Sequence, residues 1–467
     1  MSSSSSRSSR ISKAWKKESE KHTTRIETAR DKMKALGEEL NHRNMSSAEY
    51  WERAMDYAVL GRWLSLCQLE RAEYDFRTFY IDDHGPEVKF MRTDKARLFR
   101  ESMMAWDLKG KIYERRAAGA EAVETEKSTR LKSLIPVSAM PPSRFDIEAT
   151  FAPHGFRNSI IADQGLVDPR EKDNRRYWSY LWNIFSGAYE YGGYRRFEAL
   201  PVFASQSNPD LATALFGSSN IDSPSSLFSS FNGLLLPDYM GARFDSGIMA
   251  IVPDISSPTS PSEIALWKNT TPREYKLKIF TQNRETEQTG GLMQDINSFT
   301  NARRPVPLRD MDGSKVGFPA SAQEGRPKEC YLFFHYCVQI LRQAWKGLPI
   351  VDGERPGSDW GAVGKYVSCE QMRAVVDELG GEYEGLMGCA GDGVGDGDGG
   401  GDRYTLLEAL AEQVIDSNQM NGRRDELYGD EEDEDSDEHD CDDDWCPMKT
   451  PYYNPTDIAN TSYRLDE

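Results

Sequence analysis

Four side chains in the middle of the chain have types and spacing that suit metal-dependent chemistry. Glu198, Asp238 and Asp245 offer carboxylates, and Asn232 offers an amide. Carboxylate oxygens are ligands that Mg²⁺ prefers, so a carboxylate site for this ion is one hypothesis. A carboxylate is a weaker base than an imidazole near neutral pH. We therefore expect Glu198 to bind a metal more readily than it removes a proton from water.

The histidines of the chain lie away from this segment. The sequence has six of them, namely His22, His42, His84, His154, His335 and His439, and none falls between residues 170 and 334. No local histidine can therefore take the part of a general base beside Glu198. His335 lies in the apolar string YLFFHYCVQIL, which predicts a histidine buried in a helical core.

Five ordered segments resemble the HNH nuclease-like domain found in many predicted fungal proteins. They match its entry strand, its catalytic strand with the following helix, its NGLLL and FD-x-G segment, its L-D-G-x-x-x-x-F segment, and its closing R-P-x-x-x-Y-L-x-F-H-Y segment. In this chain they read LWNIFSGAY from Leu181, FEALPVFASQSNPDLATALFG from Phe197, NGLLLPDYMGARFDSGIMAIVPD from Asn232, LRDMDGSKVGF from Leu308, and RPKECYLFFHYCVQILRQAW from Arg326. The resemblance covers about a third of the chain and excludes the N-terminal helices.

The resemblance implies a ββα core that binds one divalent metal, with three residues in defined roles. The first histidine of such a core acts as general base, the asparagine orients it, and the second histidine binds the metal. The matching positions here are Glu198 for the first histidine, Asn232 for the asparagine, and Gly241 for the second histidine. Only Asn232 is retained, so the resemblance implies a degenerate core. Its retention has a second explanation, because an asparagine before glycine commonly forms turn hydrogen bonds.

The elements that would position these residues give an α+β pattern. Strands are predicted at RFEALPVF, GLLLP, IMAIVPD and EYKLKIFT, and helices at PDLATALFG, PDYMGARF and KECYLFFHYCVQILRQAWK. Upstream, long amphipathic helices are expected over 11–40, from Ser46 or Ser47 onward, and over 94–134. The fold class that follows is an HNH-like ββα core with flanking strands and helices, preceded by a long helical hairpin.

Composition shifts divide the chain into six predicted regions. These are a basic, partly helical N-terminal segment (1–45), a helical hairpin or coiled-coil-like region (46–135), a linker or docking segment (136–176), an HNH nuclease-like domain (177–350), a Gly/Asp-rich linker with short helices (351–420), and an acidic disordered tail (421–467).

The net charge of −19 comes mostly from the end of the chain. Residues 425–444 hold fourteen Asp or Glu and no Lys or Arg, which leaves −5 for the rest. A clustered basic face, the usual mark of nucleic-acid binding, is not evident around the candidate core. The tail fits a solubility role, a mimic of nucleic acid, or a site for a basic partner.

Cysteine usage and hydropathy predict an intracellular protein, cytoplasmic or nuclear. The seven cysteines are scattered and suit reduced thiols rather than a disulfide framework. No apolar run approaches the roughly 18 residues that a bilayer span needs, so no membrane partner is expected.

Three functions follow from these features. The first is a catalytically impaired or inactive HNH-like protein that acts as a binding or scaffold protein for nucleic acid or a protein partner, with no cofactor. The second is a metal-dependent endonuclease that cleaves nucleic acid with Mg²⁺ or Zn²⁺, Glu198 and Asn232 being catalytic and Asp245 and Asp238 binding the metal. The third is a helical protein-interaction module in the N-terminal half.

Overall fold

The structure is a computed structural model that describes most of residues 4–428. Residues 1–3 and 429–467 are outside the description, as are several internal stretches, the longest being 80–89, 127–153, 281–307, 347–359 and 387–403. The Gly/Asp tract at 391–402 and most of the predicted acidic tail fall in these ranges. Residues 1–422 form one compact unit. No described helix is long and apolar enough to cross a membrane.

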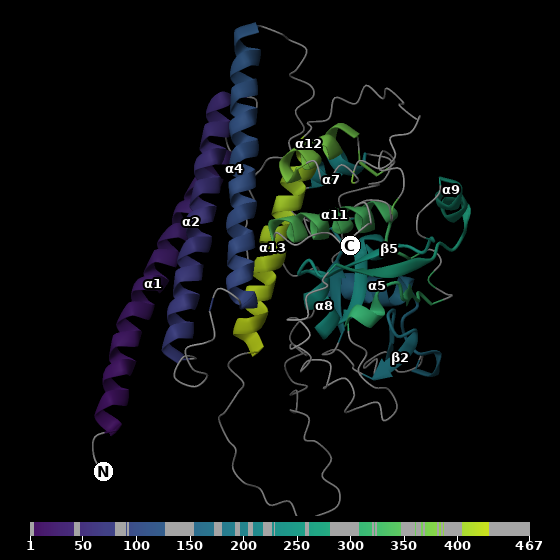
Figure 1. Cartoon of the computed structure of the whole chain (residues 1–467), viewed down its shortest axis with the longest axis horizontal. Helices are drawn as coiled ribbons and strands as arrows, with labels where there is room; N and C mark the ends of the chain where they lie inside the picture. Colours follow the sequence, from purple (N-terminus) through teal and green to yellow (C-terminus); the bar gives the residue numbers. More distant parts are fainter. Residues whose placement is uncertain are drawn as a thin grey trace, which may run out of the picture. The chain divides into compact units, whose positions relative to one another are not determined.

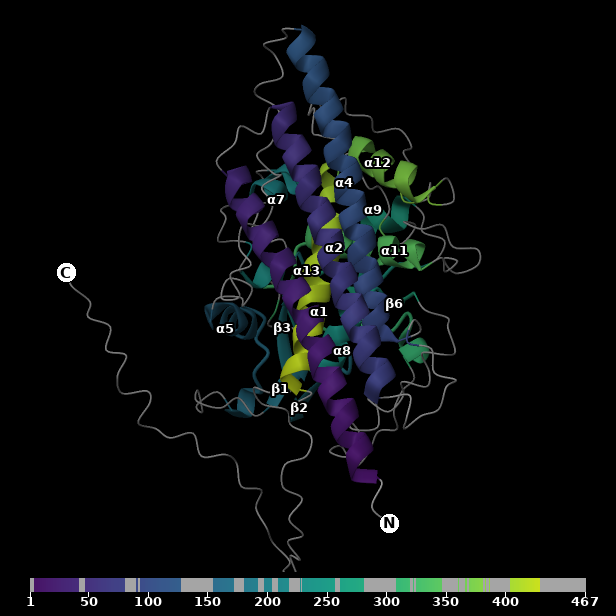
Figure 2. The ribbon, with the colours of Figure 1, turned by 90° about the vertical axis from the view of Figure 1, so that its left-hand side faces the viewer.

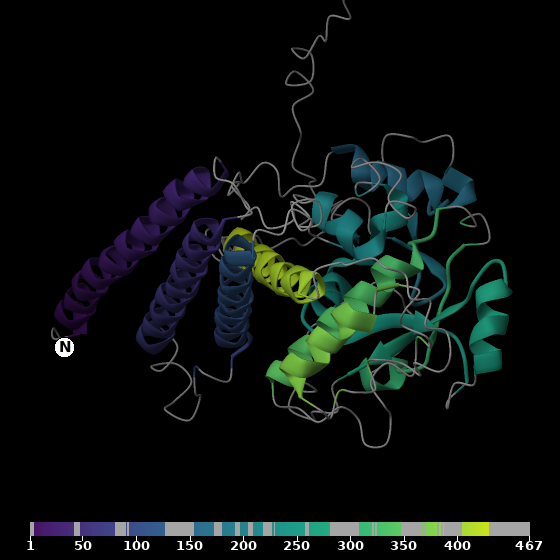
Figure 3. The same cartoon turned by 90° about the horizontal axis from the view of Figure 1, so that it is seen from above.

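Three long antiparallel helices form the N-terminal part of this unit. They lie side by side in the order α1 (Ser4–Asn41), α2 (Ala48–Phe79) and α4 (Asp94–Glu126), as Figures 1 and 3 show. Ser47 caps α2, because its Oγ accepts a hydrogen bond from the Tyr50 backbone N at 3.2 Å. The predicted helical hairpin is thus present, and α1 adds a third helix to it.

A regular spacing of buried side chains explains how α1 packs on α2. The inward residues of α1 recur at alternating steps of three and four, namely Ser19, His22, Ile26, Ala29, Met33, the partly buried Leu36, and Leu40. This repeat is the one that coiled coils use to keep one helix face against a partner. Figure 2 shows α1 and α2 alongside each other over most of their length.

Gly61 gives the clearest local constraint in the α2–α4 contact. A Cβ added at Gly61 would lie 2.3 Å from a carbon of the Trp106 indole, which is buried. Since the ring is rigid and held on all sides, it cannot move away cheaply. The glycine therefore permits the close approach of the two helices.

We expect Gly61→Ala to lower the free energy of unfolding by about 1–3 kcal/mol through overpacking. This loss should exceed the gain of roughly 1 kcal/mol that alanine brings to a helix interior. The matched control is Gly119→Ala on α4, where an added Cβ meets nothing within 4 Å. Urea unfolding of both variants checks the prediction, and a Gly61→Ala protein as stable as the parent would refute the contact.

The second part of the unit contains three small antiparallel sheets. They pair β1 with β2, β3 with β4, and β5 with β6 and β7 in that order. The strands are β1 (Tyr180–Asn183), β2 (Ala188–Tyr191), β3 (Phe197–Pro201), β4 (Gly233–Pro237), β5 (Met249–Pro253), β6 (Tyr275–Ile279) and β7 (Lys315–Val316). All residues of β4 and β5 are buried, which accounts for their uninterrupted apolar sequences.

Helices and short 3₁₀ turns surround these sheets. The helices are α5 (His154–Asp163), α7 (Pro209–Phe216), α8 (Asp238–Phe244), α9 (Pro261–Asn269), α11 (Glu329–Trp345), α12 (Cys369–Leu379) and α13 (Thr405–Tyr428). The described chain is therefore a mixture of helices and small antiparallel sheets, and the predicted α+β class is confirmed at that level.

Two helices differ from the sequence-based expectation. The described half of the predicted linker, 136–176, contains α5, which packs Phe156 and Ile160 against the β3–β4 pair. This segment therefore packs on the sheet as a helix, although its sequence shows little hydrophobic periodicity. Further on, α13 extends well past the predicted short helix TLLEALAEQVI and is buried over most of residues 405–418.

Candidate functional site

The candidate core is an antiparallel strand pair followed directly by a short helix. Strand β3 pairs with β4 so that Glu198 lies opposite Leu236 and Pro201 opposite Gly233. Helix α8 begins at the next residue, Asp238, and packs against both strands. The predicted strand, strand and helix are thus present in that order.

Glu198 and Gly241 face each other across this arrangement. A Cβ added to Gly241 would lie 3.1 Å from the Glu198 Oε2 and 3.1 Å from the Leu200 Cδ1. The Glu198 carboxylate therefore lies against the α8 backbone at the position where the resemblance expects a second histidine. A side chain at 241 would therefore require the carboxylate to shift by a few tenths of an ångström.

Asn232 is fully buried, and its amide is used by the backbone. Its Oδ1 accepts from the Phe203 backbone N at 2.8 Å, and its Nδ2 donates to the carbonyls of Phe203 and Leu227, both at 2.9 Å. The Asn232 carbonyl also accepts from the Val202 N at 2.9 Å. The two hydrogen bonds with Phe203 resemble those between paired β-strands. They hold Phe203, which lies just after β3, beside Asn232, which lies just before β4.

The two candidate aspartates lie at opposite ends of α8. Asp238 is the first residue of the helix and Asp245 follows its last residue. Seven residues of α-helix rise about 10 Å, so the backbones of the two aspartates are about that far apart. The side chain of Asp238 is outside the described part of the chain. The backbone carbonyl of Asp245 accepts a hydrogen bond from Arg342 of α11.

The described residues do not bring a metal-ligand set together. Within them, no group of three His, Cys, Asp or Glu side chains is placed to hold an ion. At the core itself, Gly241 has no side chain to bind a metal, and the Asn232 side-chain amide already forms hydrogen bonds with the backbone. The donor set that the resemblance implies for a divalent metal therefore does not fit the described geometry, and we derive no step through such an ion.

His335 is a buried core residue, as its sequence context predicts. Its ring stacks on Phe244 at 3.6 Å between centroids, and its Nε2 lies 3.0 Å from the Phe244 carbonyl oxygen and 2.8 Å from Gln339 Nε2. Burial lowers the pKa of His335 to about 3, so the ring stays neutral at physiological pH. Its contacts link α11 to the end of α8.

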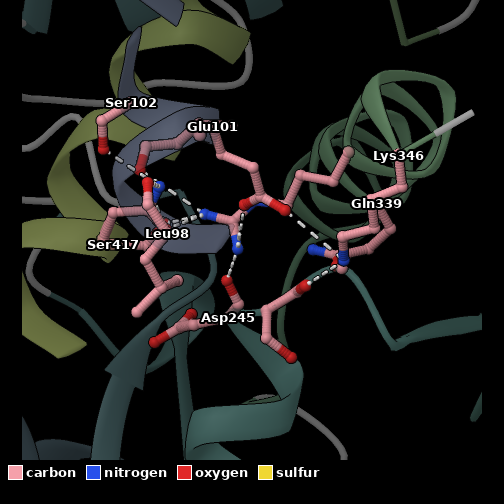
Figure 4. A network of polar contacts seen from close by, with 12 residues as sticks. Leu98, Glu101, Ser102, Asp245, Gln339, Lys346 and Ser417 are labelled. Carbon is pink, nitrogen blue, oxygen red and sulfur yellow. Dashed lines mark hydrogen bonds and ion pairs between the residues drawn. The ribbon is translucent and has the colours of Figure 1, made fainter. Parts of the chain in front are cut away.

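A polar network around Arg342 joins the candidate core to two distant helices. Arg342 is fully buried, donates to the Asp245 carbonyl and to Ser417 of α13, and lies 3.9 Å from Glu101 of α4. Lys346 lies 3.5 Å from the same Glu101 carboxylate. Figure 4 shows Glu101, Asp245, Lys346 and Ser417 converging from their separate elements.

The sequence offered a weak signal for this network. Arg342 is the one Lys or Arg in the largely apolar helix α11, and a cation in such a place needs a buried partner. The partner, Glu101, lies more than two hundred residues away on a helix with many exposed charges. Spacing alone does not connect the two.

Comparison with known proteins gives no relative for this chain: no protein-family model matches it, and no curated protein or solved structure matches it significantly.

Proposed function

We propose that this protein is a scaffold or binding protein built on an HNH-like core whose phosphodiester cleavage is lost or strongly reduced. The observation that carries the proposal is the commitment of the Asn232 amide to the backbones of Phe203 and Leu227. An amide with both donors and its acceptor bonded inside the core stabilises the fold. It is not available to orient a catalytic group.

The likeness to an HNH core is supported by the order and contacts of β3, β4 and α8. The two positions that the resemblance aligns with histidines, Glu198 and Gly241, adjoin each other in space although they are far apart in sequence. Two residues with these roles would need that proximity. Here the two positions are close together although neither residue is a histidine. This arrangement supports a core that keeps the HNH-like fold without its catalytic side chains.

Metal-dependent cleavage is the alternative function. It would use Glu198 and Asn232 as catalytic residues and Asp245 and Asp238 as ligands of Mg²⁺ or Zn²⁺. It requires the Asn232 side chain to leave its backbone partners and the two ends of α8 to contribute to one ion. For this reason we rank it second.

A calorimetric titration of the full chain with Mg²⁺ and with Zn²⁺ tests the proposal. The carboxylates of residues 425–444 would add a background of weak cation binding, so the informative quantity is the difference between the parent protein and Glu198→Gln, which keeps the shape of the side chain. We expect superimposable titrations. A saturable site of about one ion per chain that disappears in Glu198→Gln would support the nuclease instead.

The binding partner of such a scaffold would be nucleic acid or protein, in the cytoplasm or the nucleus. The long helices α1, α2 and α4 are the natural candidates for a protein-interaction module. Helix α4 buries Lys109 against Glu412 of α13, with 3.1 Å between Nζ and Oε1. An isolated fragment of residues 1–135 would expose that cation, so partner capture is better tested on the full chain.

A further inference from the structure

Helix α13 carries a row of acids on its buried face. Glu408, Glu412 and Asp416 follow one another at four-residue steps, so they lie on one side of the helix. Glu408 is fully buried, Glu412 is nearly so, and Asp416 is partly buried. Carboxylates in such surroundings require cations nearby, because an unpaired buried charge is strongly unfavourable.

Helix α4 supplies one cation for each of the first two acids. Lys109 Nζ lies 3.1 Å from Glu412 Oε1, and Arg116 Nη1 lies 2.6 Å from Glu408 Oε2. Burial disfavours the Lys109 cation, but the two glutamates outweigh this effect and raise its pKa. Lys109 therefore stays charged over the whole neutral range, and so does the guanidinium of Arg116.

Aromatic side chains enclose these two pairs. Lys109 Nζ lies 5.2 Å from the centroid of the Trp106 ring and 5.9 Å from that of Tyr113, and the Arg116 guanidinium lies 4.9 Å from that of Trp51. Rings in these positions attract the cations through their π faces, and both cationic side chains are largely buried. The α4–α13 contact is therefore a largely buried electrostatic interface in which charge balance matters.

Asp416 is the third acid and has no cation of its own among the described residues. The groups that face it are Lys109 from α4, Glu412 from α13, and Tyr57 from α2. Burial raises the pKa of Tyr57, so that ring is neutral near pH 7. When Glu408 and Glu412 are both ionised, an ionised Asp416 gives the interface three negative charges against two positive ones, and a protonated Asp416 gives an even balance.

We propose that the α4–α13 interface is a proton-controlled junction, which is closed most firmly when Asp416 is protonated and loosens when Asp416 ionises. The effect extends beyond the interface, since Ser417 and Asn418 both contact Arg342 of α11. A loosened α13 would release Arg342 from one side of its network. The inference does not depend on whether the HNH-like core cleaves.

The direction of the pH effect follows from the titration of Asp416. Burial, reinforced by the negative charge of Glu412, raises the pKa of Asp416 from 3.8 to about 7. Between these two values the closed state holds a proton that the open state has lost, so stability of the contact falls as pH rises and levels off above about pH 7. Burial also raises the pKa of Glu408, so the contribution of Asp416 must be isolated by substitution.

Hydrogen exchange of the full chain at pH 5.5 and pH 8.5, corrected for intrinsic exchange rates, tests the junction. In the parent protein we expect the opening of residues 405–418 to increase roughly tenfold or more over this range. Asp416→Asn mimics the protonated side chain and should fold normally. It should show a much smaller increase, and it should be more protected than the parent at both pH values, with the larger difference at pH 8.5.

The matched control is Glu114→Gln, which removes an exposed carboxylate from α4 and should keep the pH response of the parent. Three results would overturn the junction. The first is a parent protein in which the exchange of residues 405–418 does not depend on pH. The second is an Asp416→Asn variant with the same pH response as the parent, and the third is an increase in exchange that is equal over the whole chain.

Discussion

Replacing Asn232 by alanine is expected to lower the free energy of unfolding by about 3–5 kcal/mol. The substitution leaves the Phe203 N–H and the carbonyls of Phe203 and Leu227 without their partner. Each buried polar group that loses its partner costs about 1–3 kcal/mol, and water has no access to the site because Asn232 is completely buried. Urea unfolding followed by circular dichroism measures the loss.

Two further substitutions separate this structural role from a catalytic one. Asn232→Asp keeps an acceptor for the Phe203 N–H but places an acid against two carbonyl oxygens, so it should be at least as damaging as alanine. Asn269→Ala, at an exposed position at the end of α9, should change stability by no more than about 0.5 kcal/mol. An Asn232→Ala protein with the stability of the parent would mean that the amide does not hold β3 to β4.

Replacing Arg342 by methionine is expected to cost about 3–5 kcal/mol. Methionine fills a similar volume but leaves Glu101, which is nearly fully buried, with Lys346 as its remaining cation at 3.5 Å. It also removes the hydrogen bonds that Arg342 donates to the Asp245 carbonyl and to the Oδ1 of Asn418. Removing one partner of a buried ion pair is costly in this way because the other charge stays behind.

The loss should be coupled to Glu101. In the Arg342→Met background, Glu101→Gln should cost less than it does in the parent, because it removes the charge that was left behind. Arg30→Met on the exposed face of α1 is the control and should be close to neutral. Additive effects of the Arg342 and Glu101 substitutions would show that the network does not act as a unit.

Much of the fold could be predicted because local pattern and tertiary packing agree. Strands β3, β4, β5 and β6 and helix α11 fall where their apolar residues predict them. The spacing of Met33, Leu36 and Leu40 likewise predicts the buried face of α1. Strands β1 and β2 are harder, because four residues carry little periodicity.

The rest depends on partners that are far apart in sequence. Helix α13 is buried on nearly every side over 405–418, so its pattern of acids suggests a solvated helix until Lys109 and Arg116 are placed opposite it. In the same way, the structural role of Asn232 depends on its hydrogen bonds with Phe203. The local sequence does not predict that these two residues are neighbours. The sequence identified Glu198, Asn232 and Gly241 as the positions to inspect, whereas their contacts required the structure.

The most direct test of the scaffold proposal is a cleavage assay with purified full-length protein. Supercoiled plasmid and single-stranded RNA are incubated with the protein and Mg²⁺, Mn²⁺, Ni²⁺ or Zn²⁺, and compared with the same reactions using Glu198→Gln. We predict no conversion of either substrate above the level of that variant. Metal-dependent cleavage by the parent protein that Glu198→Gln abolishes would contradict the loss of catalysis.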